Sequence, residues 1–151
     1  MNANQAMILK KQRAAILSVV SNTVLVLVKL AVGIMTGAVS IMSEALHSGV
    51  DLVAALVAWY AVRKSGKPPD AHHAYGHGKI ESLSAAFEAL LIIVAAVWIV
   101  AEAADQFRAG HRPEMLGYGM AVMALSIAVN IGVSGRLMKV ARSTGSHALE
   151  A

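Results

Sequence analysis

The sequence predicts an all-α membrane protein with four membrane-spanning helices, and three observations support this. Of its 151 residues, 57% are hydrophobic and only 15% are charged, whereas soluble domains carry about 25% charged residues. Four apolar stretches are each long enough to provide the roughly 20 helical residues that cross a bilayer. Lys and Arg gather in short clusters between these stretches, as they do in loops that flank membrane helices.

The predicted helices are, in chain order, residues 14–35, 39–62, 80–104 and 115–138. The basic residues before the first stretch would also suit a signal peptide, but the apolar run is too long and no small-residue cleavage site follows it. The short turn Met35-Thr36-Gly37 predicts a tight antiparallel hairpin of the first two helices. Pro68 and Pro69 forbid helix continuation between the second and third.

The distribution of basic residues predicts the orientation. The N-terminal segment, the loop between the second and third helices and the segment after the fourth helix together hold ten Lys and Arg residues: Lys10, Lys11, Arg13, Arg63, Lys64, Lys67, Lys79, Arg136, Lys139 and Arg142. The loop between the third and fourth helices holds two, Arg108 and Arg112. By the positive-inside rule, both termini and the middle loop lie in the cytoplasm. We expect a multi-pass protein of a bacterial inner membrane.

Composition excludes several other functions. The net charge of +4 does not indicate a nucleic-acid partner, because the basic residues form no stripe on one polar element. The chain has no cysteine, so any metal ligands must be His, Asp, Glu or backbone groups. An intramembrane metalloprotease would need an H-E-x-x-H helix, which is absent. We therefore expect a secondary transporter with no enzymatic activity and no organic cofactor.

The second predicted helix carries the polar residues that indicate metal binding. Ser40, Glu44, His47 and Asp51 follow helical spacing, which predicts that they share one face. Asp51 lies about ten residues into the helix, at a depth of roughly 15 Å. An imidazole and a carboxylate at i and i+4 can reach one ion, and this ligand pair suits zinc and similar metals. The alternative is a His–Asp hydrogen bond that only ties helices together.

Each of the other predicted helices also has a polar stripe. Asn22, Glu88 and Asn130 are candidate supporting residues of the site, together with Glu44. Hydrogen bonds between helices are the simpler explanation for Ser18, Ser126 and Ser134. Glu81 lies near the start of its helix, where solvation would suffice, whereas the deeper Glu88 needs a partner. Lys29 either snorkels outward or pairs with Glu44 across the hairpin.

The loop between the second and third helices is rich in potential ligands. Three His and one Asp lie within residues 70–77, beside two glycines. Three protein ligands in a turn would leave an exchangeable position on a bound metal. The alternative is a solvated polar loop, or one that contacts lipid headgroups.

The sequence resembles the cation diffusion facilitator family of proton-coupled divalent-metal exporters. The resemblance rests on Asn22, on Lys29 with Gly33 and Thr36-Gly37, on the string S-E-A-x-H-S-x-x-D at residues 43–51, on G-H-G-K-x-E-S at 76–82, and on residues 142–151. It implies that His47 and Asp51 supply half of a tetrahedral transport site. It also implies a second metal site at Asp70, His73 and His77. In the family, a His at the position of His47 is associated with a preference for zinc, and an Asp at that position with a preference for manganese.

The resemblance also implies features beyond this sequence. Family members have six membrane helices, the remaining transport ligands on the fifth, usually a cytoplasmic C-terminal domain, and a dimeric assembly. We therefore expect residues 1–151 to be the N-terminal four-helix part of such a transmembrane domain, without the C-terminal domain, taken from a longer protein or completed by a second polypeptide. The expected function is zinc or other divalent-metal efflux by metal/proton antiport. The alternatives are a small four-helix multidrug antiporter and a non-transporting membrane subunit.

Overall fold

The computed structural model describes residues 3–37, 39–67, 74–109 and 116–150. These residues form four long helices and one short helix: α1 (Ala3–Thr36), α2 (Val39–Ser65), α3 (Lys79–Ala109), α4 (Leu116–Thr144) and α5 (His147–Glu150). Each long helix is long and apolar enough to cross a membrane. The predicted all-α fold with four membrane-spanning helices is confirmed.

The helices extend beyond the predicted apolar stretches. α1 begins at Ala3 rather than near residue 14, and α4 ends at Thr144 rather than near 138. Hydropathy marks only the part of a helix that suits hydrocarbon, whereas backbone hydrogen bonding continues until a stop signal. Most of the extra turns carry Lys and Arg. We call the end of the bundle where α2 ends and α3 begins the basic end.

Glycines terminate two of the helices. Gly37 follows α1 with a φ of 67°, and Gly145 follows α4 with a φ of 60°. Beyond Gly145, the Ser146 N–H donates a hydrogen bond to the Ala141 carbonyl oxygen at 3.2 Å, which is the capping bond of a Schellman motif. The chain thereby turns back into α5, a helix that the hydropathy pattern did not predict.

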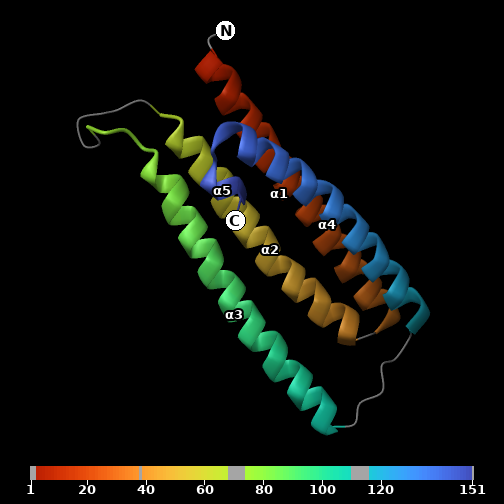
Figure 1. Ribbon diagram of the computed structural model, residues 1–151. Coiled ribbons are helices and arrows are strands. Elements are labelled where there is room, and N and C mark those ends of the chain that lie inside the picture. The colour runs from red at the N-terminus through yellow and green to blue at the C-terminus, as the bar shows by residue number, and fades with distance from the viewer. Residues whose placement is uncertain (1–2, 38, 68–73, 110–115, 151) are drawn as a thin grey trace.

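The α1–α2 hairpin forms the centre of the molecule. α3 packs against α2, α4 packs against α1, and α5 folds back onto α3 and α4 (Figure 1). Most of the buried apolar residues in the described part of the chain form one cluster at the basic end: Ala14, Ala15, Ala61, Val62, Ala141, Ala148 and Leu149. Because most of these side chains are small, the helix backbones approach closely there. We call this cluster the apolar plug.

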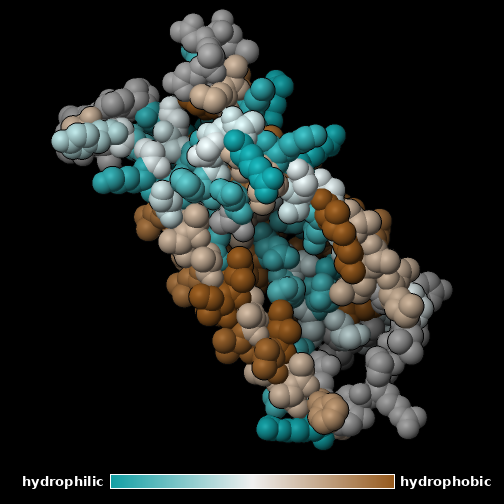
Figure 2. All heavy atoms as spheres, in the orientation of Figure 1, coloured by the Kyte–Doolittle hydropathy of each residue, from teal (hydrophilic) through white to brown (hydrophobic). Residues whose placement is uncertain are grey.

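The long helices present large apolar faces outward. Exposed hydrophobic side chains of α3 include Ile93, Val97 and Val100, and those of α4 include Ile127 and Ile131. In the space-filling view, apolar side chains cover the outer faces of α3 and α4, and polar side chains gather in the hollow between them (Figure 2). This distribution is the reverse of a water-soluble bundle and suits a bilayer.

Candidate ion-binding cavity

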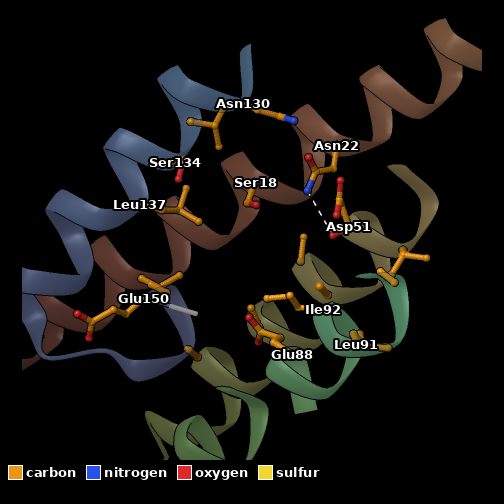
Figure 3. A pocket seen from close by; sticks show the side chains of 18 of the residues that line it. Ser18, Asn22, Asp51, Glu88, Leu91, Ile92, Asn130, Ser134, Leu137 and Glu150 are labelled. Atoms are coloured by element: carbon orange, nitrogen blue, oxygen red, sulfur yellow. Dashed lines mark hydrogen bonds between the residues drawn. The ribbon is translucent and has the colours of Figure 1, made fainter. Parts of the chain in front are cut away.

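A cavity of about 550 Å³ lies among the helices, near the middle of the bundle. All five helices contribute to its wall, which is mostly apolar. The polar and charged residues that line it are Ser18, Asn22, His47, Asp51, Glu88, Asn130, Ser134 and Glu150. Figure 3 shows several of these side chains converging from α1, α2, α3 and α4 (Figure 3). The separate polar stripes of the sequence therefore meet in one place.

The polar stripe of α2 divides into two groups with different surroundings. His47 and Asp51 line the cavity, and Asp51 is exposed within it. The Asn22 side-chain amide of α1 donates a hydrogen bond to the backbone oxygen of Asp51 at 3.4 Å (Figure 3). This bond ties α1 to the cavity-lining turn of α2 and leaves both carboxylate oxygens of Asp51 for other partners.

Glu44 belongs to the second group, which faces α1. The Lys29 ammonium donates hydrogen bonds to Glu44 Oε1 at 2.8 Å and to the Ser48 hydroxyl at 2.6 Å. Lys29 is only 2% exposed, so its charge is compensated inside the hairpin rather than at the membrane surface. Of the two predictions for Lys29, pairing with Glu44 is confirmed and snorkelling is wrong. Glu44 therefore supports the hairpin and does not line the cavity.

The remaining cavity residues come from α3, α4 and α5. Glu88 is buried and accepts a hydrogen bond from the Ser84 hydroxyl at 2.7 Å, which is the partner that its depth required. Asn130 and Ser134 line the cavity from α4, and Glu150 lines it from α5. Among residues 3–37, 39–67, 74–109 and 116–150, no three His, Asp or Glu side chains lie close enough together to hold a metal ion. His47 and Asp51 are thus at most two ligands of a site.

The comparison with protein families identifies the chain. The model of the cation efflux transmembrane domain matches residues 15–151. The chain belongs to the cation efflux family. The resemblance read from the sequence motifs is thereby confirmed, and the four apolar helices are part of an integral, multi-pass membrane protein.

Several relatives of this cation efflux chain come from bacteria. It is 32% identical to the cation-efflux pump FieF of Klebsiella pneumoniae over 142 residues, 92% of this chain and 46% of the pump. It is 31% identical to an uncharacterized transporter of Synechocystis, over 91% of this chain and 44% of the transporter. It is 29% identical to the manganese efflux system protein MneP of Bacillus subtilis, over 66% of this chain and 33% of that protein. The chain spans less than half the length of these relatives. No solved structure gives a significant match.

The predicted loop site of this cation efflux chain is only partly described. Asp70 and His73 lie outside the described residues. His77 is 3% exposed, and its carbonyl oxygen accepts a hydrogen bond from the Ile80 N–H at 3.1 Å, which begins α3. Its position is therefore fixed by the start of that helix. A loop metal site stays a prediction.

The prediction that Glu81 is solvated is wrong. Glu81 is 6% exposed and accepts hydrogen bonds from Lys11, Ser65 and Ser146. Glu81 lies seven residues, or about two turns, before the buried Glu88, and this spacing places both side chains on the same, inward-facing side of α3.

Three serines also differ from the expectation of hydrogen bonds between helices. Ser126 donates to the Val122 carbonyl oxygen of its own helix at 2.9 Å, because a serine hydroxyl can reach back one turn. Ser18 and Ser134 line the cavity. Sequence reasoning also missed Glu150, because no motif indicated that α5 folds back over the cavity.

Proposed function

We propose that this chain forms the N-terminal four-helix part of a cation efflux transmembrane domain, and that the full-length protein exports a divalent metal ion. The observation that carries the proposal is the position of His47 and Asp51 on successive turns of α2, facing one central cavity. A neutral imidazole nitrogen and a carboxylate oxygen form a mixed ligand pair that suits zinc better than the harder magnesium or calcium ions. Zinc is therefore the proposed substrate.

The proposed site needs ligands from outside α1–α4. Zinc takes four ligands in a tetrahedral arrangement, and α2 supplies two. We assign the others to a further helix that follows α5, as the family resemblance implies. α5 already lies at the edge of the cavity through Ala148, Leu149 and Glu150, so a chain continuing from it would start at the wall of the cavity that His47 and Asp51 also line.

The proposed mechanism is exchange of metal for protons. A carboxylate and an imidazole must both be deprotonated to bind a metal ion, so protons and metal compete for His47 and Asp51. Metal binds where protons are scarce and is displaced where they are abundant. Rocking of the helices would expose the site to the two sides in turn. The proton gradient then drives metal efflux, and the protein is a secondary transporter rather than an enzyme.

The assembly and the second site are proposals of the same kind. The basic end of the bundle faces the cytoplasm of a bacterial cell, in keeping with the positive-inside rule. The full-length protein forms a homodimer.

Asp70, His73 and His77 bind metal in an exchangeable way on the cytoplasmic side, because three ligands leave one position open.

Metal flux into vesicles tests this proposal. The full-length protein is reconstituted with a metal-sensitive dye inside, and zinc is added on the basic side under an opposing proton gradient. Asp51→Asn preserves the size of the side chain and removes its charge. Because the neutral amide cannot supply the deprotonated carboxylate ligand that the metal needs, we expect the initial rate to fall by at least about tenfold, the effect of about 1.4 kcal/mol.

Asp105→Asn is the matched control, because Asp105 is exposed at the far end of α3 and away from the cavity. It keeps the wild-type flux. A zinc flux that survives Asp51→Asn would reduce the His47–Asp51 pair to a structural role. A protein that moves lipophilic cations and no zinc would be a multidrug antiporter, and one that moves neither would be a non-transporting subunit.

A further inference from the structure

Glu81 connects four segments of the chain at the basic end. Its Oε1 accepts hydrogen bonds from the Lys11 ammonium of α1 at 3.0 Å and from the Ser65 hydroxyl of α2 at 2.6 Å. Its Oε2 accepts a hydrogen bond from the Ser146 hydroxyl, immediately before α5, at 2.5 Å. Since Glu81 itself belongs to α3, one carboxylate joins α1, α2, α3 and the start of α5. We call these four residues the Glu81 clamp.

Two of the four residues of the Glu81 clamp are buried, and Lys11 and Ser65 are half-buried. Glu81 is 6% exposed and Ser146 is 1% exposed, so water cannot readily replace their hydrogen bonds. Lys11 balances the negative charge at the edge of the group. Removing the carboxylate leaves the buried Ser146 hydroxyl and the half-buried Lys11 ammonium without their acceptor, which costs more than the loss of a surface ion pair.

The apolar plug lies directly between the Glu81 clamp and the cavity. On α1, Ala14 and Ala15 are about one turn from the cavity residue Ser18, and on α2, Ala61 and Val62 are one turn from Ala58. On α4, Ala141 is one turn from the cavity residue Leu137. In each helix the plug residue is the one nearer the basic end. The plug residues of α1, α2 and α4 therefore lie at the basic end of the cavity, where small side chains pack closely.

α5 belongs both to the plug and to the wall of the cavity. Its Ala148 and Leu149 belong to the plug and also line the cavity. In Figure 1 the short helix lies at the centre of the basic half, between α3 and the pair α1 and α4. Ser146 is the residue from which α5 starts, and its side chain is held by Glu81. The position of α5 therefore depends on the Glu81 clamp.

An ion that enters from the basic side has to pass the plug. Separating α3 and α5 from the α1–α2 hairpin opens the plug, and the same movement pulls Glu81 away from Lys11 and Ser65. We propose that Glu81 is a positioning residue that holds the cavity closed toward the basic end, and that its hydrogen bonds break whenever the cavity opens to that side. The proposal depends on access to the cavity and not on which ion the cavity carries.

The hydrogen bonds of Lys29 with Glu44 and Ser48, which we call the Lys29 network, can be compared with the Glu81 clamp. The Lys29 network also contains a Lys–Glu ion pair, at 2.8 Å, in which the lysine is buried and the glutamate is half-buried. It joins only α1 and α2, which a short turn already connects, and it lies toward the other end of the bundle. Loss of Glu44 therefore removes a similar, partly buried charge pair without releasing α3 or α5.

Accessibility of a cysteine in the cavity tests the role of Glu81. Residues 1–151 contain no cysteine, so Ser134→Cys places a single thiol on the cavity wall once any cysteine outside these residues is replaced by serine. The full-length protein is inserted into sided vesicles, and a membrane-impermeant thiol reagent is added on the basic side. We expect Glu81→Ala to raise the labelling rate by about tenfold or more, and Glu81→Gln to raise it less, because the amide keeps one oxygen as an acceptor.

Two further variants control for general loosening of the fold. Ser146→Ala removes one donor, leaves the Lys11–Glu81 ion pair intact and is the test if Glu81→Ala does not fold; it also raises labelling. Glu44→Gln leaves labelling from the basic side unchanged. The proposal would be overturned if folded Ser146→Ala and Glu81→Gln were labelled at the wild-type rate. It would also be overturned if Glu44→Gln raised the labelling rate as much as the Glu81 and Ser146 variants do.

The result is separable from the proposed metal transport. Faster labelling in the Glu81 variants of a protein that moves no zinc would support the Glu81 clamp and reject zinc as the substrate. Unchanged labelling in a protein whose zinc flux depends on Asp51 would reject the Glu81 clamp and leave the transport site standing.

Discussion

Individual polar residues in this bundle differ chiefly in what their side chains contact. Glu44 is paired with Lys29 inside the α1–α2 hairpin, and Glu81 is held by three donors from distant segments. His47 and Asp51 instead line a central cavity. A carboxylate that is already paired stabilises the fold, whereas one that lines a cavity can take a ligand. This contrast separates the structural acids from the proposed ion ligands.

The identity of the residue at position 47 is expected to set metal preference. His47→Asp replaces a nitrogen ligand by a harder oxygen ligand, which favours manganese over zinc. In reconstituted vesicles, we expect the ratio of zinc to manganese initial rates to fall by roughly tenfold, the effect of about 1.4 kcal/mol. An unchanged ratio in a variant that still transports would show that His47 is not a ligand of the transported ion.

Local sequence patterns predicted some of these residues and not others. The i, i+4 spacing of His47 and Asp51 predicted their common face, because it depends only on helix geometry. The predicted common face from Ser40 to Asp51 included too many residues, because Glu44 pairs with Lys29 and faces α1 instead of the cavity. Glu81 was misread because its partners Lys11 and Ser146 are 70 and 65 residues away in the chain. No local pattern indicates contacts at that separation.

Hydropathy predicted correctly that four long helices exist, but it predicted their ends less well. All four apolar stretches became long helices, since a backbone in hydrocarbon has to satisfy its own hydrogen bonds. Their ends depend on other signals. α4 continues to Thr144 and stops where Gly145 adopts a positive φ, and the polar extension before this point carries no hydropathy signal.

The orientation of the helices is a testable expectation. Lys67→Cys reports on the α2–α3 connection and Arg108→Cys on the last turn of α3. Because ten Lys and Arg residues lie in the three segments at the basic end, we expect an impermeant thiol reagent to label position 108 from outside intact cells and position 67 only after the cells are opened. Labelling of position 67 in intact cells would reverse the proposed topology. The two variants control for each other.

The cavity is a property of the whole molecule. Its polar wall combines Asn22, Asp51, Glu88, Asn130 and Glu150 from five different helices. The sequence predicted a polar stripe on each long helix but not their convergence, which depends on how α3 and α4 pack around the central hairpin. Nor did it predict α5, which lines the cavity only because the turn at Gly145 and the Glu81–Ser146 hydrogen bond direct it there.

In the proposed mechanism, an ion binds in this cavity between His47 and Asp51. Anomalous scattering from crystals of the full-length protein grown with zinc measures this directly. We predict an anomalous peak within about 2.0–2.2 Å of a His47 ring nitrogen and an Asp51 carboxylate oxygen, with a second, weaker peak at the loop of Asp70, His73 and His77. Strong zinc peaks elsewhere, with no density between His47 and Asp51 at saturating zinc, would show that these residues do not form the ion-binding site.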